Sequence, residues 1–156
     1  MPEAIRMGGV GKLYDEVVMD HIKNVRNYRE MCDATLHAEG VNPLCGDSFT
    51  VYLRLERELV ADATFQCECC GISMASASIM TEAVKGRSVA EARRLSSEFR
   101  ALLAGNPETT QPASAEAAAV LGVVREFPSR VSCASLAWVT LEAALDGRPR
   151  AVIGAM

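Results

Sequence analysis

Hydrophobic residues near the start of the chain repeat with the period of an α-helix. Across residues 12–28 they are separated by charged and polar residues, so we expect an amphipathic helix there. Residues 32–47 lose this period and contain glycines and an Asn-Pro pair, which predicts an irregular loop. The apolar positions of the expected helix are Leu13, Val17, Val18, Ile22 and Val25.

The period changes to two from Phe49 onward, which is typical of half-buried β-strands. Two antiparallel strands joined at Arg57-Glu58 fit this alternation best, although the turn lacks the usual Asn-Gly or Asp-Gly pair. The apolar positions that share one face are Phe49, Val51, Leu53 and Leu55 in the first strand, and Leu59, Ala61, Ala63 and Phe65 in the second.

The pattern becomes helical again after a cluster of three cysteines. Small residues over 72–84 predict a helix, and Ser88 with Glu91 forms a capping-box signature at the start of another helix. The buried side of the first of these helices is expected to carry Ile72, Ala75, Ile79, Ala83 and Val84. The apolar face of the second is expected to carry Val89, Ala92, Leu95, Phe99, Leu102 and Leu103.

The rest of the chain adds two more helices. Residues 105–114 are rich in turn-forming residues and are expected to lead into a short Ala-rich helix over 115–123. A last helix is expected over 129–145. Strands in front and helices behind predict an α+β fold, in which a small antiparallel sheet of about three strands packs against several helices.

The composition is that of an ordinary globular protein, with 49% hydrophobic and 23% charged residues. A chain of 156 residues can bury a real core as one domain. The net charge of −4, without a Lys/Arg-rich run, argues against nucleic acid as a partner. The sequence contains neither a signal-peptide pattern nor an apolar stretch that could span a bilayer, so we expect a cytoplasmic protein that does not bind membranes.

The six cysteines of a cytoplasmic chain indicate metal or thiol chemistry rather than a disulfide framework. In Cys45-Gly46-Asp47 the glycine allows a tight turn, so that the thiol and the carboxylate can approach one cation. Cys70 follows a predicted strand and Cys133 lies in the first turns of a predicted helix, where the helix dipole favours a thiolate. Together these groups could bind a tetrahedral zinc ion. Alternatively, Cys70 and Cys133 are small buried hydrophobic residues, and spacing alone does not choose between the two.

Four segments, in this order, resemble the U-type proteins of iron–sulfur cluster assembly, the IscU/SufU (NifU N-terminal-like) family. They are MDHIKNVRN at 19–27, NPLCGD at 42–47, CGISMASASIMTE at 70–82 and FPSRVSCASLAW at 127–138. The sequence is more similar to the SufU type, since Ser132 stands where the IscU type has histidine and residues 86–126 look like the SufU insertion. We therefore expect one SufU/IscU-like domain over 12–147, between a flexible N-terminus (1–11) and a C-terminal tail (148–156).

The resemblance implies that zinc is bound by Cys45, Asp47, Cys70 and Cys133. It implies a zinc-dependent sulfurtransferase that accepts persulfide sulfur from a cysteine desulfurase of the SufS type and stimulates that enzyme. Cys45 matches the sulfur acceptor, which is freed when a desulfurase histidine takes its place on the zinc. Arg130 matches an arginine that helps to stimulate the desulfurase, although a solvated surface arginine is an equally simple interpretation. Downstream iron–sulfur assembly proteins are further expected partners.

Cys67 and Cys69 depart from the family pattern, which is glycine-rich at this point. Three interpretations compete. The two thiols are bystanders that at most move sulfur away from the zinc, or they are additional ligands for an iron–sulfur cluster. In the third, Cys67 and Cys70 form a C-x-x-C redox pair. The last interpretation lacks the βαβ unit that usually surrounds such a motif. Cys69 could also replace Cys70 as a metal ligand. The surplus thiols motivate the alternative function, a non-enzymatic scaffold on which an Fe–S cluster is assembled and passed to apo-proteins.

The two histidines are not assigned as ligands. His21 is expected on the polar side of the first helix, and His37 is expected in the loop that follows. The sequence has no glycine-rich phosphate loop, and two histidines leave little room for a Ser–His–Asp set.

Overall fold

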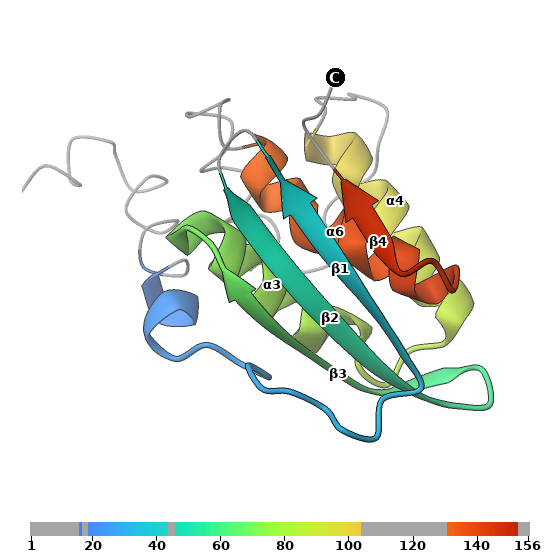
Figure 1. Ribbon diagram of the computed structural model, residues 1–156. Coiled ribbons are helices and arrows are strands. Elements are labelled where there is room, and N and C mark those ends of the chain that lie inside the picture. Colours follow the sequence, from blue (N-terminus) through green and yellow to red (C-terminus); the bar gives the residue numbers. More distant parts are fainter. Residues whose placement is uncertain (1–15, 17–18, 44–45, 104–130, 153–156) are drawn as a thin grey trace, which may run out of the picture.

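The computed structural model describes residues 16, 19–43, 46–103 and 131–152 of the chain. One four-stranded sheet, in the order β3-β2-β1-β4, is covered on one face by helices (Figure 1). The strands are β1 (Leu36–Asn42), β2 (Asp47–Glu56), β3 (Leu59–Glu68) and β4 (Arg150–Val152). The helices are α3 (Gly71–Val84), α4 (Val89–Leu103) and α6 (Val131–Leu145). The α+β class is thus confirmed.

The sheet is mixed, and two of its strands lie where the sequence predicts none. The prediction of an irregular loop over 32–47 is wrong for residues 36–42, which form β1 and pair antiparallel with β2. Residues 150–152 of the expected tail form β4, which pairs parallel to β1. The outer face of β1 carries His37 and Glu39, and Gly40 interrupts its apolar positions, so the strand has little alternation to reveal it. β4 is too short to show any period.

The β2–β3 hairpin turns at the expected residues 57–58, the first of which adopts a φ of 60°. The pairing shifts within the hairpin, since Arg54 lies opposite Asp62 but Leu55 lies opposite Val60. One additional residue therefore stands in β3, as in a β-bulge.

The additional residue is Ala61, and it reverses the faces of the residues before it. Val60 is fully buried, whereas Leu59 is 51% exposed. The prediction that Leu59 and Ala61 share a face with Ala63 and Phe65 is wrong for this reason. Beyond the bulge, Ala63 and Phe65 lie in the core as expected.

The predicted capping box at the start of α4 is confirmed. The Ser88 amide donates to Oε1 of Glu91 at 3.1 Å, and the Glu91 amide donates to the Ser88 hydroxyl at 3.1 Å. These bonds satisfy two donors that an uncapped helix would leave without partners. The first helix ends earlier than expected, since its last helical residue is Lys23. The expected helix over 115–123 lies outside the described residues.

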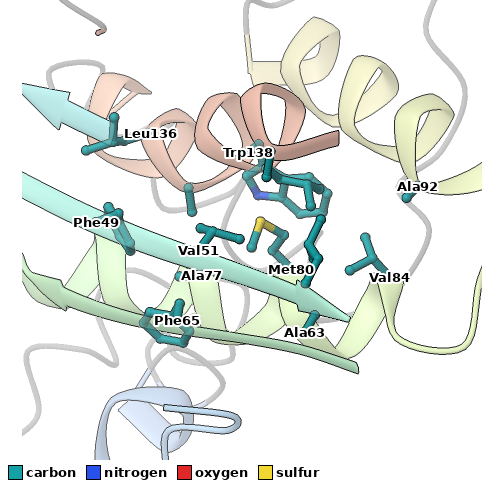
Figure 2. Close-up of a cluster of buried hydrophobic side chains, with 14 of the residues drawn as sticks. Phe49, Val51, Ala63, Phe65, Ala77, Met80, Val84, Ala92, Leu136 and Trp138 are labelled. Carbon is teal, nitrogen blue, oxygen red and sulfur yellow. The ribbon is translucent and has the colours of Figure 1, made fainter. Parts of the chain in front are cut away.

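The core lies between the inner face of the sheet and the helices (Figure 2). Trp138 of α6 stacks on Phe99 of α4 with ring centroids 4.7 Å apart, and its indole N–H donates to the Ser76 hydroxyl of α3 at 3.1 Å. One aromatic side chain thereby joins three helices. Other buried members are Phe49, Val51, Leu53, Phe65, Met80, Val84, Ala92, Leu136 and Leu141. None of the helices in the described part of the chain has the length and apolar character needed to cross a bilayer.

His21 does not lie on a solvated face, contrary to the prediction. It is only 2% exposed, and its Nδ1 lies 2.8 Å from the Ser78 hydroxyl of α3. The same hydroxyl accepts a hydrogen bond from the Arg26 amide at 3.0 Å. The small polar residues of α3 supply the partner that a buried imidazole needs, which the pattern of the first helix alone does not show.

Candidate metal centre

Asp47, Cys70 and Cys133 lie together, although they are far apart in the sequence. One ligand atom from each lies within 4.8 Å of the other two. Asp47 begins β2, Cys70 is the N-cap residue of α3, and Cys133 lies in the first turn of α6. The start of one strand and the starts of two helices thus meet at one point. Asp47 and Cys133 are buried, at 6% and 4% exposure, and Cys70 is half-buried.

Ser73 connects the three groups. Its hydroxyl donates to Oδ2 of Asp47 at 2.6 Å and lies 3.0 Å from the carbonyl oxygen of Cys133. Sγ of Cys70 lies 3.5 Å from the same hydroxyl. Ser73 is completely buried, so these contacts are not shared with bulk water. Ser73 was not among the candidate residues predicted from the sequence, although its position three residues after Cys70 places it in the first turn of the same helix.

The surroundings of Cys70 favour its thiolate. Burial raises the pKa of the Cys70 thiol, but its hydrogen bonds with the side chain and backbone of Ser73 and with the Cys133 side chain outweigh this effect. The nearby Asp47 carboxylate raises the pKa by a smaller amount. The net pKa lies below its ordinary value, as expected of a thiol at a helix N-terminus.

Two hydrogen bonds fix the turn before β2, and the second of them reaches α6. Gly46 adopts a φ of 79° and donates its N–H to the Asn42 carbonyl at 2.8 Å, which is the tight turn expected from the sequence. The Asn42 side chain donates to the Ser132 hydroxyl at 3.2 Å. Ser132 therefore links the helix that carries Cys133 to the turn that leads to Asp47.

The donor set fits zinc. Two sulfur atoms and one carboxylate oxygen are ligands that zinc accepts in tetrahedral sites, and the three groups converge in a largely buried place. A fourth ligand is needed to complete the tetrahedron. Cys45, the fourth predicted ligand, lies outside the described residues, as does Arg130. The assignment of all four ligands therefore stays a prediction.

Cys67 and Cys69 are joined by a disulfide. This bond leaves Cys70 as the thiol of the CECC segment that lies beside Asp47 and Cys133, rather than Cys69. It also pairs Cys67 with a different cysteine from the one expected in a C-x-x-C redox motif. The bond joins residues two positions apart, so it cross-links no distant parts of the chain.

Ser73→Ala is expected to weaken zinc binding by roughly 10- to 100-fold, because Asp47 loses the hydrogen bond that orients its carboxylate. Chelator competition measures this affinity. Ser76→Ala is the matched control, since Ser76 is also fully buried on α3 and donates to a carbonyl of α6, at Ala134. Both variants lose buried hydrogen bonds, since Ser76 also accepts from the Trp138 indole, but only the first touches the metal ligands. Equal zinc affinities of the two variants would contradict the role of Ser73.

Comparison with known proteins identifies relatives over most of the chain. Residues 13–134 match the model of the NifU-like N terminal domain. The chain is 39% identical over 130 residues to the zinc-dependent sulfurtransferase SufU of Bacillus subtilis, covering 83% of this chain and 87% of that protein. It is 35% identical over 133 residues to the iron–sulfur cluster assembly scaffold protein IscU of Thermotoga maritima, covering 85% and 92%.

A solved structure shares the fold. It is a putative iron–sulfur cluster assembly scaffold protein for the SUF system from Fervidobacterium islandicum, with a TM-score of 0.74 and 29% sequence identity. The match covers 88% of this chain and 99% of that one.

Proposed function

The chain belongs to the IscU/SufU family of iron–sulfur cluster assembly proteins, which share the NifU-like N-terminal domain, and we propose its function from this membership. We propose that it is a zinc-dependent sulfurtransferase. It accepts persulfide sulfur from a cysteine desulfurase of the SufS type and stimulates that enzyme. The observation that carries the proposal is the meeting of Asp47, Cys70 and Cys133 within 4.8 Å. The name of the Bacillus relative supports zinc and sulfur transfer as the chemistry.

In this proposal Cys45, Asp47, Cys70 and Cys133 hold the metal. Zinc is redox-inert and keeps bound thiols deprotonated. Cys70 and Cys133 are anchored at helix starts and Asp47 by Ser73, so they form the fixed part of the site. Cys45 directly precedes the left-handed Gly46, which leaves it as the ligand suited to exchange.

Cys45 is the proposed sulfur acceptor. Its thiolate attacks the outer sulfur of a persulfide on the desulfurase, the sulfur–sulfur bond of that persulfide breaks, and the desulfurase cysteine leaves as a thiolate. The sulfane sulfur is then bound to Cys45, and no external oxidant or reductant is consumed. Arg130 is proposed to contribute to desulfurase stimulation, because in the sequence it directly precedes α6, the helix that carries Cys133.

The alternative function, a scaffold for an Fe–S cluster, was motivated by surplus thiols. In this structure Cys67 and Cys69 are bonded to each other, so neither is a thiolate available to iron. The Thermotoga relative is named a scaffold protein, so the scaffold function is the competing hypothesis that the experiment must test.

Metal analysis and desulfurase kinetics test the proposal. Freshly purified protein is expected to be colourless, to hold about one zinc ion per chain, and to raise the turnover of a SufS-type desulfurase. A matched sample stripped of metal should not stimulate the enzyme until zinc is restored. A brown protein that contains iron and leaves desulfurase turnover unchanged would support the scaffold and contradict the sulfurtransferase.

A further inference from the structure

The Cys67–Cys69 pair lies next to the candidate metal centre but takes no part in it. Cys67 is near the end of β3, and Cys69 lies in the short link between β3 and α3. Both side chains are partly buried and pack against the core. The metal-site thiol Cys70 follows directly, yet its contacts are with Ser73 and Cys133. The chain therefore carries two separate sulfur sites on adjacent residues.

The backbone of Cys67 is held firmly. The Tyr28 hydroxyl donates to the Cys67 carbonyl oxygen at 2.9 Å, and the Cys67 N–H donates to the Tyr28 oxygen at 3.3 Å. On the other side Cys67 lies opposite Phe49 of β2. Tyr28 in turn packs edge-on against Phe65, with ring centroids 5.2 Å apart. Cys67 thus stands on a rigid strand, while Cys69 stands beyond the strand end.

A hollow of about 430 Å³ lies beside this position, with Cys67 among its lining residues. It opens at the end of the sheet where β2 begins and β3 ends, the same end at which Asp47 lies. Its surface is mostly polar, which suits a charged or hydrated sulfur donor better than an apolar ligand. Among its lining residues are Tyr28, Ser48, Thr50, Gln66, Cys67 and Glu68.

We propose that Cys67 and Cys69, in their dithiol form, are a second sulfur site that releases sulfane sulfur as sulfide. Three observations carry this: the disulfide between the two residues, the rigid support of Cys67 by Tyr28, and the polar hollow beside Cys67. The identity of the physiological sulfur donor rests on the proposed function, since a persulfide on Cys45 or on the desulfurase would supply the sulfur. The disulfide seen in the structure is the product state of this reaction.

The chemistry proceeds in two balanced steps. In the first, the Cys67 thiolate attacks the outer sulfur of a donor persulfide, and the donor leaves as a thiolate. In the second, the Cys69 thiolate attacks Sγ of Cys67, the Sγ–Sγ bond forms, the bond to the sulfane sulfur breaks, and hydrosulfide leaves. The two cysteine sulfurs are oxidised and the sulfane sulfur is reduced. A dithiol reductant then restores the pair for another turnover.

A desulfurase-free assay tests the pair by itself. Zinc-loaded full-length protein is treated with dithiothreitol, desalted and mixed with glutathione persulfide, and sulfide release and the mass of the peptide that contains residues 67–69 are followed. Wild type and Cys32→Ser, whose changed residue is exposed and lies elsewhere, should release one sulfide per chain and regain the disulfide. Cys69→Ser should retain one extra sulfur atom on Cys67 and release sulfide at least about tenfold more slowly, because the intramolecular step is lost. Cys67→Ser should neither retain the sulfur at position 69 nor release sulfide quickly.

Two results would overturn the proposal. One is equal sulfide release by wild type and Cys69→Ser. The other is a wild-type pair that stays oxidised in dithiothreitol or stays reduced after the persulfide has been consumed. Failure of the proposed function appears in a different assay, as unchanged desulfurase turnover or absence of zinc. The glutathione persulfide assay contains no desulfurase, so the two failures can be told apart.

Discussion

Cys133→Ser is expected to lower zinc affinity by more than about 100-fold. Losing a hydrogen bond that supports a ligand costs up to about 100-fold, and this variant removes a ligand itself. A neutral hydroxyl does not replace a thiolate at a zinc site. Cys133 is 4% exposed, so water has little access with which to fill the empty coordination position. Desulfurase stimulation should be lost together with the metal. Zinc content after dialysis and desulfurase turnover with the same variant are the two measurements.

Companion variants make this result specific. Cys70→Ser should behave like Cys133→Ser, and Asp47→Ala should lose zinc less completely, since a carboxylate oxygen is the more weakly held donor of the set. Cys32→Ser is the control, because it also removes a thiol but from an exposed position outside the cluster. Normal zinc content in both Cys133→Ser and Cys70→Ser would place the metal elsewhere. Asp47→Ala with unchanged zinc affinity and sulfur acceptance would remove Asp47 from the site.

Gly40→Ala is expected to lower the free energy of unfolding by about 3 kcal/mol, as overpacking of a tight interface does. Gly40 lies in β1 where α6 passes over the sheet, and a Cβ atom added there would stand 1.8 Å from Oγ1 of Thr140. Thr140 cannot turn away freely, since the same Oγ1 donates to the Leu136 carbonyl at 2.7 Å. The strand and the helix must therefore separate. Urea unfolding at fixed zinc concentration measures the loss.

A double-mutant cycle identifies the clash as the cause. Thr140→Ala removes Oγ1 but leaves a Cβ at 3.0 Å, so Gly40→Ala should cost clearly less in the Thr140→Ala background than in wild type. Gly147→Ala is the control for replacing a glycine with nothing nearby. It should cost about 1 kcal/mol through its φ of 72° alone. Equal costs of Gly40→Ala in both backgrounds would show that Thr140 is not the obstacle.

Local patterns predicted those parts of the fold that depend on nearby residues. The capping box of Ser88 and Glu91 and the helix over 72–84 depend on neighbouring positions, and both appear as expected. The bulge at Ala61 could not be predicted from the sequence. A regular strand and a bulged strand can have the same alternating pattern and differ only in which residues of the neighbouring strand they pair with. β1 was missed for a related reason, since β2 and β4 stabilise it rather than its own alternation.

The candidate site was predictable only in part. The positions of Cys70 and Cys133 near helix starts and the turn at Gly46 follow from local signals, and the structure brings Asp47, Cys70 and Cys133 together. Ser73 was missed because a serine in a helix of small residues shows no sign of its partner. The Cys67–Cys69 bond was missed as well, because the cysteines of a chain expected in the cytoplasm were assigned to metal or thiol chemistry rather than to disulfides.

The parallel pairing of β4 with β1 has a consequence for synthesis on the ribosome. β1 is made early, and its partner β4 emerges only after β2, β3, α3, α4 and α6, so one edge of β1 lacks its partner until then. Backbone groups on an uncovered edge pair readily with strands of neighbouring chains. Closing a contact across so much intervening chain is also slow. Residues 150–152 therefore cover the exposed edge of β1 only at the end of synthesis, although they form a small part of the sheet (Figure 1).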